Sequence, residues 1–150
     1  MPEKLPPAVD TVDTSYLEGL VGYNASRAAI TVIELFLQRM AVYGMRQVDF
    51  SVMSLITHNA GITSRQLSAA LSIQPPNLVA MINALESRAL IVRKPHPRDG
   101  RAVGLHVTPS GQKLMRDAER TAQELETEAT ARLSAAERKT LNRLLQKVYL

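Results

Sequence analysis

The sequence contains no cysteine and no tryptophan, and aromatic residues make up only 4% of its 150 positions. The absence of cysteine excludes disulfide bonds, thiolate nucleophiles, thiol-based redox sensing and zinc sites with cysteine ligands. Because aromatic side chains are so few, we do not expect a large aromatic-lined catalytic cleft. The chain therefore suits a reducing compartment, and its function has to depend on polar and charged residues.

Long apolar runs are also absent. No segment approaches the roughly 20 apolar residues that a membrane-spanning helix requires. Residues 1–13 are acidic and proline-rich, unlike the basic and then apolar pattern of a signal peptide. Their prolines disfavour a helix, so we expect a flexible N-terminal arm on a soluble, cytoplasmic protein with no membrane partner.

The positive charge is concentrated in one short stretch. The net charge of the chain is +4, and residues 88–101, with five bases and one acid, carry the same net charge by themselves. A localised basic segment on an otherwise neutral protein is typical of a surface that binds a polyanion, because each phosphate contact releases counterions. A charged loop that faces only solvent is the alternative that composition leaves open.

The spacing of apolar residues predicts a mainly helical fold. From about Ser15 to Tyr43 they recur at steps of three and four without a proline, which indicates one long amphipathic helix. Two more helices are predicted to begin after Thr108 and Ser134, where helix-start patterns occur. The apolar surface of these helices exceeds what one small core can cover, so we expect a homodimer.

The middle of the chain predicts three shorter helices and a hairpin. Asp49 is expected to cap the first helix, and Thr63 with Gln66 has the capping-box pattern that begins the second. The third is expected to span residues 74–89, with two prolines in its first turn. Segments 90–94 and 103–108 alternate like strands around a polar loop, so a β-hairpin follows.

This order of elements is that of a winged helix-turn-helix, and its residues resemble the MarR family of bacterial transcription regulators. The signal is the wing sequence Pro97-Arg98-Asp99-Gly100-Arg101, followed by Val107-Thr108-Pro109-Ser110-Gly111. The resemblance is strongest from Gly61 to Gly111. It implies a mainly α fold with a small β-hairpin wing, in which residues 14–46 and 109–150 form a helical dimerisation region and residues 47–108 bind DNA.

The resemblance implies that residues 74–89 form a recognition helix in the major groove of double-stranded DNA. Its DNA-facing side chains are expected to be Gln74, Pro76, Asn77, Ala80, Asn83 and Ala84. Asn77 is the best candidate for a base contact, since an amide can pair bidentately with adenine, but a capping or phosphate contact is the alternative. Family members often carry a basic residue where this chain has Ala80, so strong guanine recognition is not expected from this helix.

The wing is expected to compensate for the weak base recognition by this helix. By resemblance, Arg101 reaches into an A·T-rich minor groove, and Asp99 orients the wing by pairing with a nearby arginine. A surface ion pair that only closes the loop is the alternative. Further DNA contacts, mainly to phosphates, are expected from Ser64, Arg65, Arg93, Lys94 and Arg98.

Regulation by a small molecule is also implied. Many family members release DNA when an aromatic anion binds between the dimerisation helices and the winged region, and this chain lacks the cysteine of the thiol-oxidation route. We therefore expect a repressor released by an effector such as an aromatic acid. The residues expected to bind it are Tyr23, Asn24, Arg27, Arg46 and His58, for which ordinary surface positions and interhelical hydrogen bonds are the alternative.

Other classes of function find less support. The three histidines, at 58, 96 and 106, lack the short helical spacing of metal ligands, and no nucleophile or glycine-rich phosphate loop is recognisable. Neither a metal, a resident cofactor nor an enzyme is therefore expected. A winged-helix module that binds protein without DNA readout is the alternative function. Four methionines are expected to fill core gaps: Met40, Met45, Met53 and Met81.

Overall fold

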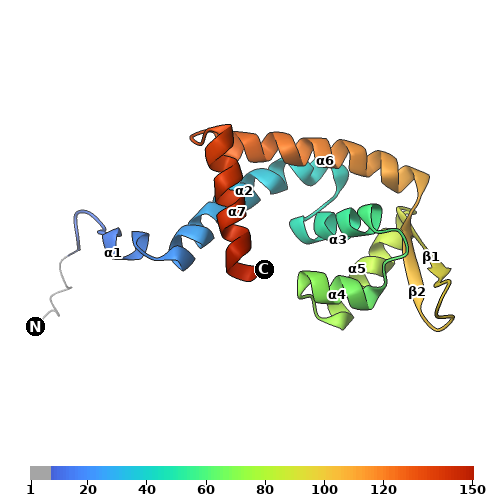
Figure 1. Ribbon diagram of the computed structural model, residues 1–150. Helices are drawn as coiled ribbons and strands as arrows, with labels where there is room; N and C mark the ends of the chain where they lie inside the picture. The colour runs from blue at the N-terminus through green and yellow to red at the C-terminus, as the bar shows by residue number, and fades with distance from the viewer. Residues whose placement is uncertain (1–7) are drawn as a thin grey trace, which may run out of the picture.

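The computed structural model of the protein describes residues 8–150 and confirms a mainly helical fold with one antiparallel hairpin (Figure 1). Its elements are α1 (Ser15–Glu18), α2 (Val21–Met40), η1 (Ala41–Tyr43), α3 (Gln47–His58), α4 (Ser64–Leu71), α5 (Pro75–Ser87), β1 (Ile91–Pro95), β2 (Val103–Val107), α6 (Pro109–Ala129) and α7 (Ala135–Tyr149). Part of the expected N-terminal arm, residues 1–7, lies outside the described residues. Residues 8–13 are exposed and form neither helix nor strand.

Two layers of elements build the molecule. Helices α2 and α6 run side by side in one layer, and α3, α4, α5 and the hairpin lie beneath them (Figure 1). The hydroxyl groups of Tyr43 and Thr121 are 2.8 Å apart, and Arg39 pairs with Glu128 at 2.5 Å, so polar contacts tie α6 to α2 and to the turn after it. Helix α3 packs against α6 and against β2, and therefore joins the layers.

The predicted continuous helix over residues 15–43 is wrong. Helix α1 ends before Gly19, and Leu20 is extended, with φ −102° and ψ 128°. The Asn24 amide stabilises this break by donating to the carbonyl oxygens of Glu18 (2.8 Å) and Leu20 (3.0 Å). Apolar spacing continues across the break, which is why periodicity alone predicts one helix.

The predicted cap of α3 is also displaced. Arg46, not Asp49, precedes the helix, and the carboxylate of Asp49 reaches back to accept from the backbone N–H of Arg46 at 3.0 Å. The Arg46 guanidinium donates to both oxygens of the same carboxylate, at 2.9 and 3.0 Å. Burial would raise the pKa of Asp49, but hydrogen bonds from Arg46 and the charges of Arg46 and Arg88 outweigh it and lower that pKa. The capping boxes at Thr63 and Ser134 form as predicted.

The end of α5 is connected directly to the start of α6. Helix α5 stops at Ser87, so Ala89 does not extend its inner apolar stripe as predicted; it lies at φ 56°, in the left-handed region. The carbonyl oxygen of Ala89 accepts from the hydroxyls of Thr108 (2.6 Å) and Ser110 (2.9 Å). The backbone N–H of Thr108 donates to Leu90 O at 3.0 Å, so two successive carbonyls anchor α6.

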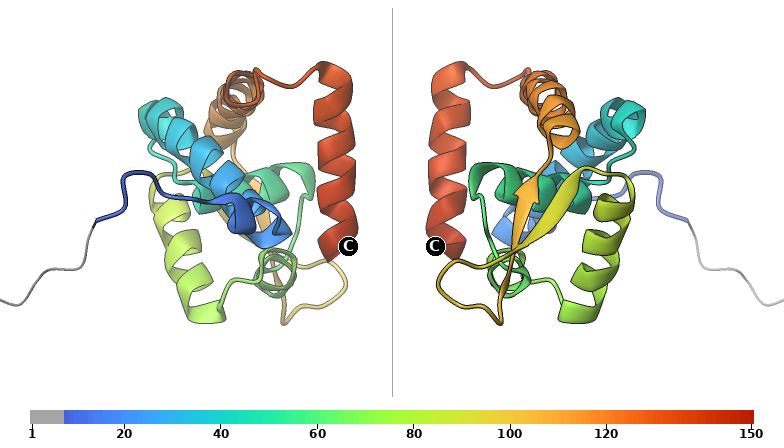
Figure 2. Two further views of the ribbon diagram at one scale, coloured as in Figure 1. Left: turned by 90° about the vertical axis from the view of Figure 1, so that its left-hand side faces the viewer. Right: turned by 90° about the vertical axis from the view of Figure 1, so that its right-hand side faces the viewer.

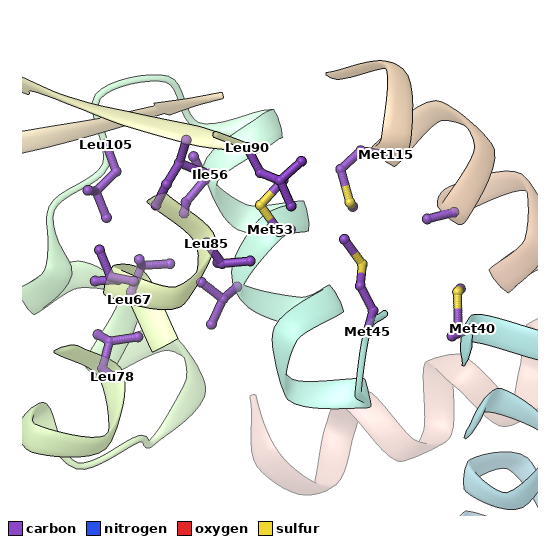
Figure 3. Close-up of a cluster of buried hydrophobic side chains, with 14 of the residues drawn as sticks. Met40, Met45, Met53, Ile56, Leu67, Leu78, Leu85, Leu90, Leu105 and Met115 are labelled. Atoms are coloured by element: carbon purple, nitrogen blue, oxygen red, sulfur yellow. The ribbon is translucent and has the colours of Figure 1, made fainter. Parts of the chain in front are cut away.

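Methionines occupy the space between the layers. Met40, Met45 and Met53 are at most 4% exposed, as predicted, whereas Met81 is only partly buried. Met115, which the sequence did not single out, faces the same space from α6 (Figure 3). Unbranched thioether side chains fill the irregular gap left where helices of different layers cross. The remaining core is mainly leucine and isoleucine from α3, α4, α5 and the hairpin.

Helix α7 stands apart from both layers (Figure 2). None of its residues is buried, and Arg138 attaches it by donating to the hydroxyl of Thr130 at 2.6 Å. Large apolar side chains are exposed on it, on α1 and α2 and at the break between these two helices: Tyr16, Leu17, Leu20, Val21, Ile30, Leu37, Leu141, Leu144, Leu145, Val148 and Tyr149. A single copy of the chain therefore leaves a broad apolar surface open to solvent.

Among residues 8–150, no single helix has the length and apolar composition needed to cross a membrane. One bent pair, residues 21–43 and 47–58 at 66°, passes the same test of length and composition. Three residues of its second segment, Val52, Met53 and Ile56, are fully buried in the protein core.

The close contact between α6 and Leu90 predicts that one methyl group added at Gly111 lowers stability strongly. A Cβ on Gly111 would lie 2.1 Å from Leu90 O, whose position is fixed by Thr108. Gly111→Ala is expected to lower the free energy of unfolding by about 1–3 kcal/mol, as overpacking does. Urea denaturation measures it. Gly100→Ala, where the added Cβ meets nothing within 4 Å, is the control; an equally small effect at both positions would show that α6 can move away.

Candidate nucleic-acid interface

Helices α4 and α5 form the helix-turn-helix. Helix α4 ends at Leu71 and is capped by Ser72, which adopts φ 53°, and α5 begins at Pro75 after the extended residue Gln74. The inner stripe is as predicted, because Leu78, Ile82 and Leu85 are at most 3% exposed. All the residues predicted to contact DNA from α5 or its cap are exposed: Gln74, Pro76, Asn77, Ala80, Asn83 and Ala84.

The side chains at the centre of the outer face of α5 are small, apolar and uncharged. Pro76 and Ala80 occupy it, and Asn77 lies in the first turn, where helix-turn-helix proteins contact base edges. Val79, which the sequence analysis missed, is 50% exposed on the flank. A helical projection of the stripe Leu78–Ile82–Leu85 places Val79 outside the core and could have identified it.

At the start of α4, Ser64 and Arg65 are both exposed. They follow the Thr63 cap, at the end of the helix where backbone N–H groups point outward. This position suits contacts with phosphate, because the helix dipole favours an anion there.

The wing tip is ordered by backbone hydrogen bonds. The carboxylate of Asp99 accepts from the N–H of Arg101 at 3.0 Å, and Nδ1 of His96 accepts from the N–H of Arg98 at 3.2 Å. The predicted ion pair between Asp99 and an arginine does not occur among residues 8–150. A turn of the type Asp-x-Arg lets the carboxylate bond its own backbone two residues on, which competes with a side-chain partner.

Of the five basic side chains in residues 88–101, two form hydrogen bonds with other parts of the protein. The Arg88 guanidinium donates to the carbonyl oxygens of Tyr43 (2.7 Å) and Gly44 (3.0 Å), at the turn between η1 and α3. Arg93 donates to Glu86 at 3.0 Å and to Asn83 at 2.5 Å, both on α5. Lys94, Arg98 and Arg101 are exposed and make no ion pair within residues 8–150. The cationic surface of the wing is therefore narrower than the sequence predicts.

The five residues predicted to bind an effector do not form one site within the chain. Arg46 and His58 lie at opposite ends of α3, about 18 Å apart along its axis. Each has an acidic partner, because Arg46 pairs with Asp49 and His58 lies 2.6 Å from Glu119. The hydrogen bond to Asp49 raises the pKa of Arg46 further.

The other three predicted effector residues lie on α2. The Asn24 amide is used at the helix break, as described above. Tyr23 and Arg27 are four residues apart, so they share one face of α2, with the ring half-buried and the guanidinium exposed. This pair places an aromatic residue and a cationic residue on one face of α2, whereas the wider set does not assemble.

A surface hollow of about 510 Å³ lies elsewhere, between the end of α3, α4 and the wing. Its lining includes none of the five predicted effector residues and consists of Leu55, Asn59, Ala60, Gly61, Ile62, Gln66, Ala70 and His96. Among the described residues, no three acidic, histidine or cysteine side chains gather in a way that could hold a metal ion.

The chain matches known regulators over its full helix-turn-helix and beyond. The model of the MarR family matches residues 45–103, from the turn before α3 to the start of β2. A transcriptional regulatory protein named for the hcr operon of Thauera aromatica is 30% identical over 134 residues, covering 89% of this chain and 81% of that protein. The multiple antibiotic resistance protein MarR of Salmonella typhimurium is 34% identical over 101 residues, covering 67% and 70%.

A solved structure extends the match in space. The transcriptional repressor CouR, bound to a 23-mer DNA duplex, superposes with a TM-score of 0.86 at 32% identity, covering 94% of this chain and 100% of that one. The similarity thus includes the helices on both sides of the helix-turn-helix as well as the wing. The chain belongs to the MarR family, whose members are dimeric winged helix-turn-helix regulators of transcription.

Proposed function

We propose that the protein is a repressor that binds a specific sequence of double-stranded DNA in the bacterial cytoplasm. The observation that carries this proposal is the wing: its tip is fixed by backbone hydrogen bonds, while Lys94, Arg98 and Arg101 remain exposed on it. The similarity to the repressor CouR, whose structure was solved with a DNA duplex, supports both DNA binding and a repressor role.

Two copies bind together in this proposal. Residues 14–46 and 109–150 form the dimerisation region, because the exposed apolar residues of α1, α2 and α7 lie there. Residues 47–108 contact DNA. Two-fold symmetry then requires a pseudo-palindromic operator whose half-sites are separated by about 10 base pairs, one turn of the duplex.

An aromatic acid is the class of effector that we propose. Its ring would lie against Tyr23 and its carboxylate against Arg27, which share one face of α2. Arg46 and His58 are less suited, since each is held by a carboxylate. Binding would favour a dimer whose recognition helices no longer match consecutive major grooves.

Selection of duplexes from a random pool tests the function. Enrichment of a pseudo-palindromic sequence, with log affinity falling steeply and linearly against log salt, is the expected result. A weak salt dependence without any enriched sequence would instead support the alternative, a winged-helix module that binds protein.

Replacing basic residues of the wing separates minor-groove contacts from phosphate contacts. Arg101→Ala is expected to weaken binding about tenfold or more on sites with A·T-rich flanks, because the narrow minor groove there concentrates negative potential. Lys94→Ala is expected to weaken all sequences alike and to reduce the salt slope by about one. Titrations over a salt series on flank variants measure both. Equal, sequence-independent losses would refute the minor-groove role of Arg101.

Removing the amide of Asn77 tests direct readout by α5. Asn77→Ala is expected to relax the preference at one base pair of each half-site, at a cost of about 1–3 kcal/mol. Repeating the duplex selection with the variant gives the result. An unchanged selected sequence with uniformly lower affinity would show that Asn77 contacts phosphate.

The effector proposal predicts a linkage. Benzoate or a ring-hydroxylated benzoate is expected to bind the free dimer more tightly than the operator-bound dimer, and to weaken DNA binding by the same factor. Calorimetry on both forms measures the two affinities. Arg27→Ala is expected to abolish binding, while Arg46→Ala, whose side chain is tied to Asp49, serves as the matched control. Equal affinities for both forms would exclude the tested acid as an effector.

A further inference from the structure

One cation of the wing is bound to the recognition helix. Arg93 lies in the middle of β1, opposite Leu105 of β2, and its side chain crosses to α5. Its Nε donates to Glu86 at 3.0 Å, and its Nη2 donates to Asn83 at 2.5 Å. Asn83 and Glu86 are three residues apart and so lie on one face of α5. We call these three residues the wing brace.

The wing brace changes what Asn83 can do. A guanidinium only donates hydrogen bonds, so the amide oxygen of Asn83 must be the atom that faces Arg93. Adenine recognition by an amide needs that oxygen and the amide nitrogen together. The hydrogen bond from Arg93 therefore fixes the orientation of the Asn83 amide and competes with the bidentate adenine contact expected of a groove-facing asparagine.

The wing brace also changes what Arg93 can do. Two of its three nitrogens have partners, and Glu86 neutralises its charge. The side chains of Arg93 and Glu86 are 41% and 44% exposed, so their ion pair adds little to global stability. A planar guanidinium with two fixed acceptors does, however, impose a defined geometry on the elements that it joins.

These elements are the two DNA-binding parts of the protein. On one side is α5, and on the other is the strand that continues through Lys94 to the wing tip at Arg101. We propose, on the basis of the function proposed above, that the wing brace fixes the separation along the operator between the base pairs contacted by α5 and the minor-groove stretch reached by Arg101. Asn83, Glu86 and Arg93 are then positioning residues that determine spacing specificity.

The physical reason is the pitch of the duplex. Each base pair added between the two contacts moves the minor-groove stretch by about 3.4 Å along the axis and also rotates it. A wing free to pivot on α5 follows this displacement, whereas a braced wing does not. Spacing specificity therefore depends on the stiffness of the joint rather than on any base contact.

Binding to operators of altered spacing tests the proposal. The probe is the best duplex from the random-pool selection, compared with a version that has one base pair inserted between core and flank of each half-site. The wild-type protein is expected to prefer the original spacing by about tenfold or more. Arg93→Ala, Arg93→Lys and Asn83→Ala are expected to reduce this preference to about threefold or less, and Asn83→Asp, which keeps an acceptor, to preserve it.

The neighbouring Lys94→Ala provides the matched control. It is expected to lower the salt slope by about one while keeping the spacing preference, whereas Arg93→Ala keeps the slope and loses the preference. The opposite pattern for Arg93→Ala, a lower slope with intact preference, would identify Arg93 as a phosphate ligand. A relaxed base preference in Asn83→Ala with intact spacing preference would identify Asn83 as a base contact. Either result overturns the proposal.

A measurement without DNA separates this proposal from the proposed function. Because the chain has no cysteine, spin labels can be attached at Val79→Cys on α5 and Gly100→Cys at the wing tip, both exposed positions. With labelled protomers diluted into unlabelled protein, the distance distribution is expected to be narrow, and to broaden with Arg93→Ala. An unchanged width refutes the wing brace even if operator binding is confirmed. A failure to bind any duplex refutes the proposed function and with it the role in spacing, while a narrow distribution that broadens with Arg93→Ala would still show that the wing brace stiffens the joint.

Discussion

The fold depends on the pair of backbone carbonyls at Ala89 and Leu90. They follow the recognition helix directly, and they accept hydrogen bonds from Thr108 and Ser110 at the start of α6. Gly111 allows the closest approach of α6 at this point, since any side chain would collide with Leu90 O. Through this joint, the end of α5, the base of the hairpin and the first turn of α6 are held as one unit. The Arg88 clamp on the carbonyls of Tyr43 and Gly44 ties the same end of α5 to the turn that follows α2.

Features encoded by adjacent residues could be predicted from the sequence. The capping boxes at Thr63 and Ser134, the proline start of α5 and the alternating strands form where local patterns place them. The errors arise where a more distant or competing partner decides the conformation. The break before α2 is stabilised by the Asn24 amide, and the left-handed Ala89 is set by its position between α5 and β1. Neither interrupts the apolar periodicity, so periodicity could not show them.

The sequence predicts where the basic residues of the candidate site lie along the chain, but it does not predict all the contacts that they make. A count of charges places five bases near the wing, yet charge does not reveal orientation. Arg88 turns to backbone carbonyls, and Arg93 turns to an amide and a carboxylate on α5. Glu86 was the available signal, because an acid on the recognition helix would repel phosphate unless a cation neutralises it. Chemical type alone suggests the five effector residues, but Asn24, Arg46 and His58 have partners within the chain that chemical type does not reveal.

Helix α7 has a consequence for how the protein is made. In one copy of the chain it buries no residue, and helices of 15 residues are marginal in water without a packing partner. In the dimer proposed above, the packing partner of α7 is the second chain, so this partner is available only after two chains have met. The folding of α7 then requires the association of two chains, so the fraction of folded α7 depends on protein concentration. A cell with few copies of the protein would hold more incomplete helices exposed to proteases, so the level of the regulator itself would set how much of it survives.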